Sequence, residues 1–292
     1  MSSSEPWTTK RLLEWTTQYL QESGSDSARL DAEVLLAEAK GCQRIELYTC
    51  FDEVPPEDQL ATFRAWIKER AAGKPVAYLV GHREFYSLSF QVNEHVLIPR
   101  PETELLVTLG IDWVNQFGNG DAQVCDVGTG SGCIPVSIAK NAKACQILAI
   151  DISKDALKVA AENAEKHGVS DRIEFMQSDL FESVDEGRTF DLIVSNPPYI
   201  GFHEKDGMET EVKDYEPDIA LFGGEAGTEV IERFLDQAVQ RLRPGGRLMF
   251  ETSPIVMDRC VELIDSRDAF CDTKIHHDLS KHPRVVESSI KS

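Results

Sequence analysis

Positive charge is scarce in this sequence. The 292 residues include 30 lysines and arginines against 50 aspartates and glutamates, a formal net charge of −20. Indiscriminate binding to a nucleic-acid backbone depends on clustered lysines and arginines, so this balance argues against that class of protein. It is compatible with a basic protein partner, and an acidic surface that only aids solubility is the alternative.

Long apolar runs, a secretory signal and paired cysteines are also missing. No stretch approaches the roughly 20 apolar residues of a membrane span, and the start, Met-Ser-Ser-Ser-Glu-Pro-Trp, has no apolar signal core. The seven cysteines are scattered and odd in number, with no CxxC pair. This pattern is typical of reduced thiols and not of disulfides or zinc sites. We therefore expect a cytoplasmic protein without membrane attachment.

The sequence also shows little sign of a metal site or of an activated nucleophile. The seven histidines lack the spacing of metal ligands, and the serine and cysteine patterns of covalent catalysis are absent. No convincing general base is visible. We expect no metal ion and a reaction that depends on positioning and electrostatics.

The first part of the chain predicts a small helical bundle. Leu12, Trp15, Tyr19 and Leu20 share one helical face, and further helices are expected over residues 30–40, near 45–48 and from 57 to about 72. We expect the aromatic side chains of this region to lie in its core. We take residues 1–75 as an N-terminal helical domain with no obvious chemistry of its own.

An alternating pattern follows the helices. Leu88, Phe90 and Val92 alternate with polar residues, Asn93-Glu94 can turn, and Val96–Ile98 resumes an extended run. This predicts a β-hairpin that connects two domains. We take residues 76–98 as a linker with this hairpin and residues 99–292 as the second, larger domain.

From residue 122 strands and helices alternate, which is typical of an α/β domain with a mostly parallel sheet covered on both faces. Helices are expected at about 132–141, 154–167, 228–242 and 254–266. A long glycine-rich loop is expected at 197–227. Strands are expected at 124–127, 147–150, 172–176, 191–195 and 247–251, and two more in the tail at 273–277 and 285–288.

A rigid polar tetrad, Asn196-Pro197-Pro198-Tyr199, follows a predicted buried strand. Both prolines lack N–H groups and fix φ, so the backbone there offers carbonyls and almost no donors. Asn196 adds a carbonyl acceptor and Tyr199 a flat ring. Such a pocket suits a planar –NH2 group, and an ordinary strand-ending turn is the alternative.

A glycine loop, Asp126-Val127-Gly128-Thr129-Gly130-Ser131-Gly132, stands between the first strand and its helix. Dinucleotide, flavin and S-adenosylmethionine (SAM) sites all use related loops. Asp126 favours SAM, because a carboxylate accepts hydrogen bonds from an amino group and repels a pyrophosphate. Asp151 ends the second strand, where an acid can bind ribose hydroxyls; a helix cap is the alternative, although Ser153 can supply that cap.

The third strand is followed by Ser178-Asp179-Leu180, at the place expected for an adenine ring. Leu180 can pack on the base and Asp179 can accept its exocyclic amine. Strand-end polarity and core packing are the alternatives. Because these features all stand at carboxyl ends of strands, where open α/β sheets bind ligands, they support one another.

The chemistry then follows from the two halves of the site. SAM carries a methyl group on a sulfonium, and an amide or aromatic –NH2 is a poor nucleophile because its lone pair is delocalised. Acceptors at Asn196 and Pro197 draw on both N–H bonds and aim the lone pair at the methyl group.

Four stretches resemble the peptide chain release factor glutamine methyltransferases, the PrmC/HemK family. They are Gly73–Phe85 (GKPVAYLVGHREF), Val96–Leu106 (VLIPRPETELL), the glycine loop and the tetrad. The tetrad is shared with DNA adenine and ribosomal RNA guanine methyltransferases, whereas Ile98–Glu104 is more specific. The resemblance covers nearly the whole chain. It implies a class I SAM-dependent methyltransferase fold, Rossmann-like, with an N-terminal helical bundle.

The resemblance also implies the substrate: the side-chain amide of the glutamine in the Gly-Gly-Gln motif of release factors, which the helical domain helps to hold. One departure lies after the fifth strand, where the family has Glu, an apolar residue and Gly, and this chain has Glu251-Thr252-Ser253. Carried over to this chain, SAM contacts fall on Gly128–Gly132, Asp151 and Leu180, the bridge between cofactor and substrate on Asn196, and the glutamine pocket on Pro197, Pro198 and Tyr199.

Two other functions stay open from the sequence. An exocyclic-amine methyltransferase acting on DNA or RNA would share the tetrad, but the acidic balance and the lack of a basic recognition domain argue against it. A SAM-binding adaptor without turnover is the other, and the intact tetrad argues against that.

Overall fold

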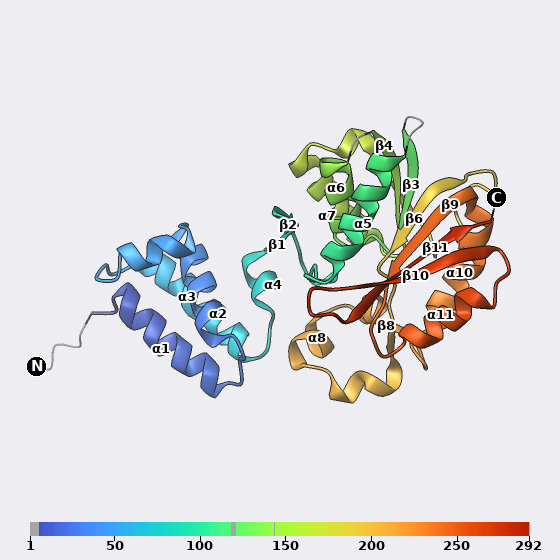
Figure 1. The fold of residues 1–292 in the computed structure, drawn as a ribbon. Coiled ribbons are helices and arrows are strands. Elements are labelled where there is room, and N and C mark those ends of the chain that lie inside the picture. The colour runs from blue at the N-terminus through green and yellow to red at the C-terminus, as the bar shows by residue number, and fades with distance from the viewer. Residues whose placement is uncertain (1–5, 118–120, 143, 292) are drawn as a thin grey trace, which may run out of the picture. The chain divides into compact units, whose positions relative to one another are not determined.

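The chain forms two compact units. The computed structural model describes residues 6–117, 121–142 and 144–291 (Figure 1). The first unit runs to Gly81 and includes Glu209–Tyr215, and the second holds His82–Met208 and the chain from Glu216 onward. None of the described helices is long and apolar enough to cross a bilayer.

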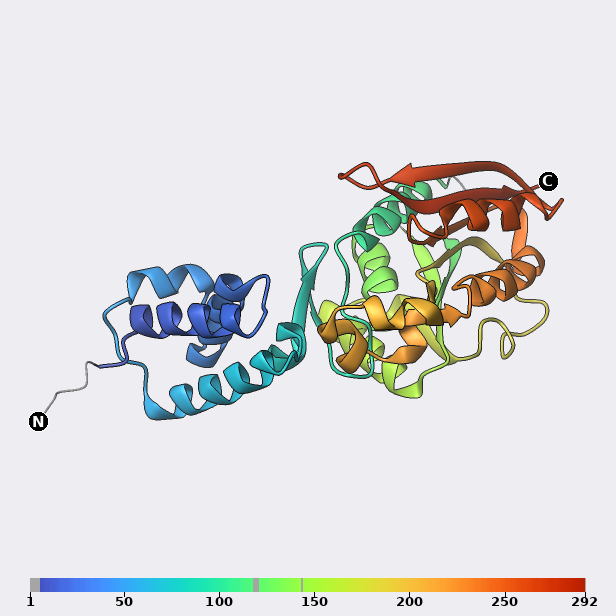
Figure 2. The ribbon, with the colours of Figure 1, turned by 90° about the horizontal axis from the view of Figure 1, so that it is seen from below.

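The first unit is the expected helical bundle, and its helices pack side by side in Figure 2. Thr8 caps the first helix by accepting a hydrogen bond from Arg11 N, and Gly41 ends the second in the left-handed conformation. Leucines of these helices form a buried cluster with Phe63. The helices are α1 (Thr9–Glu22), α2 (Ala28–Lys40), η1 (Arg44–Thr49), α3 (Glu57–Ala71) and α4 (Val76–Val80).

The expectation that the aromatic residues of this bundle lie in its core is wrong for several of them. Trp15 is 48% exposed and Tyr48 is 47% exposed, whereas Phe63 is fully buried. Helix α1 buries Leu12, Leu13, Thr16 and Leu20, and Trp15 lies beside that stripe instead of in it. Its ring stacks on a neighbouring aromatic residue, Tyr19, at 5.1 Å between centroids. This bundle therefore presents aromatic surface.

A buried ion-pair network links three helices of the first unit. Arg70 on α3 is 5% exposed, and its Nε donates to Asp31 Oδ2 on α2 at 2.7 Å. The guanidinium also pairs with Glu211 of α8 (Thr210–Tyr215), and Tyr215 Oη donates to Ala72 O at 3.0 Å. These contacts explain why α8 clusters with the helical bundle although it is distant in sequence.

We expect Arg70→Ala to lower the free energy of unfolding of the helical unit by about 3 kcal/mol, because Asp31 would keep a buried charge without its partner. Urea unfolding followed by tryptophan fluorescence reports mainly on this unit. The matched control is Arg64→Ala on the same helix, whose ion pair with Glu57 is exposed and whose loss should cost less than about 0.5 kcal/mol. Equal effects of the two substitutions would contradict the assignment.

The β-hairpin exists, but the expected position of its turn is wrong. Strands β1 (His82–Phe85) and β2 (Leu88–Gln91) pair antiparallel, and no strand forms over 96–98. The turn falls on Tyr86 and Ser87, with φ of 50° and 59°. Two successive positive φ values are the geometry of a type I′ turn, whose usual sequence is Asn-Gly. The residue types Tyr-Ser therefore do not predict this turn. Helix α4 belongs to the first unit and the hairpin to the second.

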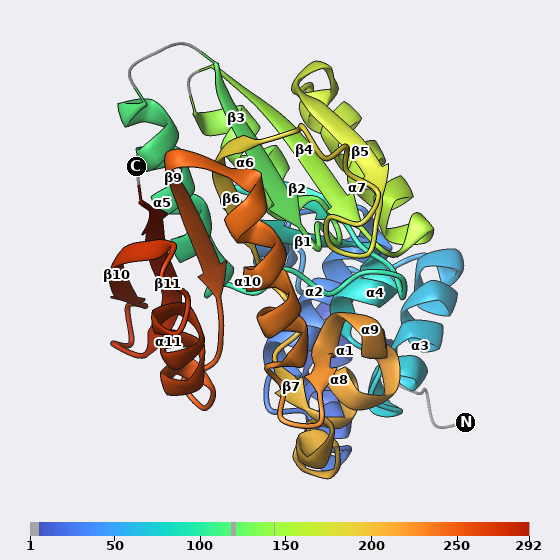
Figure 3. The same cartoon turned by 90° about the vertical axis from the view of Figure 1, so that its right-hand side faces the viewer.

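The second unit is built on a seven-stranded, mostly parallel sheet, as expected (Figure 3). The strand order is β10-β11-β9-β6-β3-β4-β5, in which β11 runs antiparallel to both β10 and β9 and all other pairs are parallel. All five parallel strands and both tail strands of the sequence analysis are confirmed. They are β3 (Ala122–Val127), β4 (Cys145–Asp151), β5 (Ile173–Gln177), β6 (Phe190–Ser195), β9 (Leu242–Glu251), β10 (Phe270–His277) and β11 (Pro283–Ile290).

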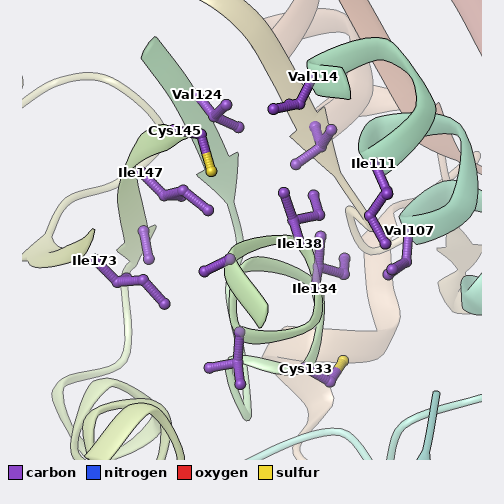
Figure 4. Packing of buried hydrophobic residues seen from close by; sticks show 14 of the residues in the cluster. Val107, Ile111, Val114, Val124, Cys133, Ile134, Ile138, Cys145, Ile147 and Ile173 are labelled. Carbon is purple, nitrogen blue, oxygen red and sulfur yellow. The ribbon is translucent and has the colours of Figure 1, made fainter. Parts of the chain in front are cut away.

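Helices cover both faces of this sheet. Successive residues of a strand point to opposite faces, so Val124 packs with α5 and α6 in one cluster while Cys125 packs with α10 and α11 in another. Figure 4 shows Val124, Ile134 and Ile138 within the first cluster. The helices are α5 (Thr103–Gln116), α6 (Cys133–Asn141), α7 (Lys154–His167), α10 (Glu229–Arg241) and α11 (Met257–Asp265), with a short turn of helix, η2 (Ser170–Arg172), before β5.

The segment after the tetrad contains short elements instead of one irregular loop. A parallel ladder pairs Ile200 with Phe222 and Gly201 with Gly224. Elements of two to six residues are too short to show a hydrophobic period, so no pattern in the sequence indicates them. They are β7 (Ile200–Gly201), η3 (Phe202–Gly207), α8, α9 (Asp218–Leu221) and β8 (Phe222–Gly224).

Candidate active site

Polar residues from the ends of four strands, β3, β4, β5 and β6, meet at the carboxyl edge of the sheet. Strand β3 lies between β4 and β6, which is where ligands bind in open α/β sheets. A pocket opens there, and it is lined by every glycine-loop residue from Val127 to Ser131 and by Asn196, Pro197 and Pro198. Its wall also includes Thr103, Asp151, Ser178, Asp179, Leu180, Ile219, Phe222 and Arg233. The structure thus brings most of the expected site residues together.

The glycine loop is held by the neighbouring strand. The amides of Gly128 and Thr129 both donate to Ile150 O, at 2.9 and 3.0 Å. Gly132 has φ of 78°, and a Cβ on it would lie 3.0 Å from Ala160 Cβ on α7. Only glycine fits there, because the backbone is left-handed and the neighbouring helix leaves no room.

Asp151 braces this loop. Its Oδ2 accepts from Gly130 N and its Oδ1 from Ser153 N, both at 2.8 Å. Ser153 caps α7 by accepting from Ala156 N at 3.1 Å, so the helix cap comes from the serine as expected. Each Asp151 oxygen keeps a further lone pair, and ribose binding by this carboxylate stays a prediction.

Three side chains of the loop have polar atoms without partners. Both carboxylate oxygens of Asp126, Thr129 Oγ1 and Ser131 Oγ are buried and make no hydrogen bond within the described chain. Burial raises the pKa of Asp126 to about 7, the nearby Thr129 hydroxyl opposes this rise, and the Asp151 charge adds to it. An uncompensated buried carboxylate favours a cationic ligand with hydrogen-bond donors. These residues therefore fit the ammonium and sulfonium groups of SAM and disfavour a pyrophosphate.

Asp179 and Leu180 are placed at the same pocket. Asp179 Oδ2 accepts from Arg233 on α10 at 2.8 Å, a partner that the sequence did not indicate. Its other oxygen is not engaged in that contact. Leu180 is 9% exposed and has φ of 50°, an uncommon conformation for leucine that turns the chain at the pocket wall. Adenine contacts by these two residues stay a prediction.

The tetrad is anchored to the strands beside it. Ser195 Oγ donates to Val127 O at 2.7 Å, which ties the end of β6 to the end of β3. Asn196 Nδ2 donates to Thr103 Oγ1 at 3.2 Å. Pro197 is buried, and Pro198 is partly exposed in the pocket wall.

Tyr199 lies outside the wall of this pocket and packs on the cluster that covers the other face of the sheet. Burial, with the nearby Glu251 charge, raises the pKa of its phenol above the ordinary value. The side chain therefore stays a neutral phenol and does not act as a base.

Two glycines of the segment after the tetrad pack closely against the tetrad backbone. A Cβ on Gly223 would lie 2.5 Å from Pro198 O, and one on Gly227, at φ of 84°, would lie 2.5 Å from Tyr199 O. Any side chain at either position would push this segment off the tetrad. The glycines of the 197–227 segment thus serve close packing at the site.

Two site residues were missed as functional groups by the sequence reasoning. Thr103 is 2% exposed and contacts Asn196, and Glu251 is 1% exposed at the end of β9. A polar residue at the carboxyl end of a strand was the signal that identified Asp151 and Asn196, and it applies equally to Glu251. In the described ranges no group of three or more histidine, cysteine or acidic side chains is arranged to hold a metal ion.

We expect Asp126→Asn to stabilise the ligand-free protein and to weaken SAM binding. The pKa of Asp126 rises from 3.8 to about 7 on folding, so between these values the folded state binds more protons and stability falls as pH rises. At pH 8 the variant should gain about 1 kcal/mol in free energy of unfolding and lose about tenfold in SAM affinity. Urea unfolding and calorimetry measure the two effects. A variant that is less stable at pH 8, or that binds SAM as the parent does, would contradict this account.

Comparisons with known proteins agree with this geometry. Residues 11–81 match the model of the PrmC N-terminal domain, and residues 113–214 match the methyltransferase small domain. Among solved structures, a ribosomal protein L11 methylase from Lactobacillus delbrueckii subsp. bulgaricus has a TM-score of 0.50 and 22% identity over 69% of this chain and 84% of its own. A methyltransferase from Pyrococcus furiosus has a TM-score of 0.52 and 18% identity over 78% of this chain and 98% of its own. These likenesses confirm the class I methyltransferase fold.

The curated relatives are closer in sequence. The release factor glutamine methyltransferase of Rhodopirellula baltica is 48% identical over 98% of this chain and 97% of its own length. Those of Koribacter versatilis and Geobacter sulfurreducens are each 39% identical, over 96% and 98% of this chain and 97% and 98% of their own. The site fits a sulfonium cofactor, and these relatives match nearly the whole chain. The chain therefore belongs to the family of release factor glutamine methyltransferases, which are SAM-dependent enzymes.

Proposed function

We propose that this chain transfers a methyl group from SAM to the side-chain amide nitrogen of the glutamine in the Gly-Gly-Gln motif of peptide chain release factors. The observation that carries the proposal is the placement of Asn196. It begins the proline-rich turn that follows β6 and lines a pocket with Thr129 and Ser131, whose buried hydroxyls are unpartnered; the buried, unpartnered Asp126 carboxylate belongs to the same glycine loop. A cation-binding pocket beside an acceptor-rich turn is what methylation of an amide requires.

The cofactor side of the site is formed by the glycine loop. Gly128–Gly132 and Asp126 would hold the methionyl part of SAM, Asp151 the ribose, and Asp179 with Leu180 the adenine. All of these residues line the pocket except Asp126 and Gly132, which belong to the same loop. When bound, SAM supplies a methyl group on a sulfonium that is open to in-line attack. The buried Asp126 carboxylate, which has no counter-ion in the described chain, would stabilise the positive charge of the bound cofactor.

The substrate side has to make a weak nucleophile productive. Asn196 Oδ1 and the Pro197 carbonyl would accept the two hydrogens of the glutamine –NH2 group, which aims the nitrogen lone pair and raises its electron density. Pro198 and the ring of Tyr199 would confine the amide plane. No strong base is needed, because the nitrogen becomes acidic once it is methylated.

The helical domain, residues 1–75, would hold the release factor, and residues 76–98 would link it to the catalytic domain, residues 99–292. Its exposed Trp15 and Tyr48 support this role, because aromatic side chains are enriched at protein interfaces. The net charge of −20 supports a protein substrate without direct contact to nucleic acid. A role in translation termination would put this activity in the cytoplasm.

Methyl transfer from labelled SAM should be measured on a release factor and on the same factor with its Gly-Gly-Gln glutamine replaced. We expect label only on the parent factor, and mass spectrometry should locate the methyl group on that glutamine. Label that survives the replacement would sink the proposal. Naked DNA or RNA that accepts methyl groups at a comparable rate would establish the exocyclic-amine alternative instead.

Asn196→Ala should lower kcat by at least about 100-fold and leave the Kd for SAM within a few-fold of the parent value. The reason is that Asn196 aligns the amide only during the transfer, whereas the glycine loop supplies most of the cofactor contacts. Single-turnover kinetics and calorimetry separate the two effects. Full activity in this variant would remove Asn196 from the mechanism.

A further inference from the structure

The side-chain amide of Asn196 has two ends of nearly equal size and opposite chemistry. Its Oδ1 accepts hydrogen bonds and its Nδ2 donates them, so a rotation by 180° would present a donor where the reaction needs an acceptor. The tetrad prolines fix the backbone and leave this rotation free. Something else in the site has to choose the orientation.

The first group that acts on the orientation of the Asn196 amide is Thr103. Its Oγ1 accepts the hydrogen bond from Asn196 Nδ2 at 3.2 Å, which leaves Asn196 Oδ1 directed elsewhere. A hydroxyl has a single hydrogen and can also act as an acceptor. Thr103 therefore selects the amide orientation only if its own hydrogen is committed to another group.

Glu251 is the group placed to take this hydrogen. The Thr103 side chain is the neighbour that most lowers the pKa of the Glu251 carboxyl, and both side chains are buried. An ionised carboxylate only accepts, so Thr103 must donate to it and must accept from Asn196. Strand pairing brings the partners together, since Ser195 on β6 lies opposite Phe250 on β9, one residue before Asn196 and Glu251.

The burial of Glu251 is only partly compensated by its surroundings. Its Oε2 makes no hydrogen bond in the part of the chain that the structure describes. The two nearby arginines are paired elsewhere, Arg100 with Glu216 at 2.6 Å and Arg284 with Asp278 at 3.0 Å. A buried carboxylate without a close counter-ion costs stability, so its presence needs a reason other than folding.

We propose that Glu251 is a positioning residue that acts through Thr103 to hold the Asn196 amide with Oδ1 toward the substrate. The relay runs from the end of β9, through the start of α5, to the end of β6. This inference rests on the proposed function, because it assigns Asn196 Oδ1 to the glutamine –NH2 group.

The relay predicts a dependence on pH. A protonated Glu251 can donate to Thr103, which frees the Thr103 hydrogen for Asn196 and removes the preference for one orientation. Burial raises the pKa of Glu251 to about 7, so this loss falls near neutral pH and a bound cation would move it lower. The other groups that act on this carboxylate are Thr103, Arg284, Glu102 and Arg100, together with Tyr199, on which it acts in turn.

The kinetic test compares Thr103→Val, which removes the hydroxyl at nearly constant shape, with Thr103→Ser, which keeps it. We expect the valine variant to lose at least about tenfold in kcat, with the Kd for SAM within about twofold of the parent, and the serine variant to retain most activity. Thr108→Val, an exposed position on the same helix, is the matched control and should leave kcat unchanged. Full kcat in Thr103→Val, or an equal loss in Thr103→Ser, would overturn the relay.

Glu251→Gln should lower kcat, and the double variant Thr103→Val/Glu251→Gln should be no worse than the poorer single variant, because both break one relay. Additive losses would contradict it. If Glu251→Gln does not fold, the Thr103 series still decides.

A second readout needs no substrate. With ¹⁵N-labelled asparagine, the Asn196 –NH2 signals, assigned by their absence in Asn196→Ala, should be protected from hydrogen exchange in the parent and in Thr103→Ser and lose protection in Thr103→Val. They should also titrate near pH 7 in the parent and not in Glu251→Gln, which excludes Asp126 as the source. If the Asn196 –NH2 signals keep their protection in Thr103→Val, the relay is overturned, whatever the activity of the variant. If the parent enzyme is inactive on release factors, that result counts against the proposed function alone.

Discussion

The parallel pairing of β3 with β4 on one side and β6 on the other is the constraint on which the site depends. It brings the carboxyl ends of three strands to one edge, and with them Asp126, Asp151 and Asn196. The hydrogen bond from Ser195 to Val127 O then fixes the tetrad against the glycine loop. Because each strand is buried on both faces, a slip of register would expose apolar residues, so the core of the domain also fixes the relative positions of these groups.

The electrostatics of the pocket are set by carboxylates that the fold buries without counter-ions. Burial raises the pKa values of Asp126 and Glu251 to about 7 and shifts the pKa of Asp151 upward, although backbone hydrogen bonds oppose the shift at Asp151. Such groups repel a pyrophosphate and favour a cation. The glycine loop is ambiguous in sequence, and the acids beside it fit a sulfonium cofactor better than a dinucleotide. The same acids weaken the ligand-free fold, which is a common cost of function.

The sequence predicted the sheet, the main helices and the residues around the pocket because these depend on period and on polar residues at strand ends. It misplaced the hairpin turn, since Tyr86-Ser87 adopts a conformation that its residue types do not favour. It also misjudged Trp15, because one helical face cannot hold every apolar residue of a bundle helix. Partners distant in sequence, such as Arg233 for Asp179, could not be predicted, since they follow from the packing of α10 beside the strand ends.

The departure at Thr252-Ser253 also has a structural reading. Thr252 is fully buried, its backbone N–H donates to Arg284 O at 2.8 Å, and its side chain contacts Cys260 Sγ at 3.6 Å. A threonine there makes its own packing and hydrogen bonds directly after Glu251, so the end of β9 stays fixed without a glycine. In the proposed relay the tetrad depends on this strand end, because two prolines hold a backbone and cannot hold an amide against rotation. In this fold a rigid turn and a rigid neighbouring strand are therefore both required, one to place the acceptor and the other to orient it.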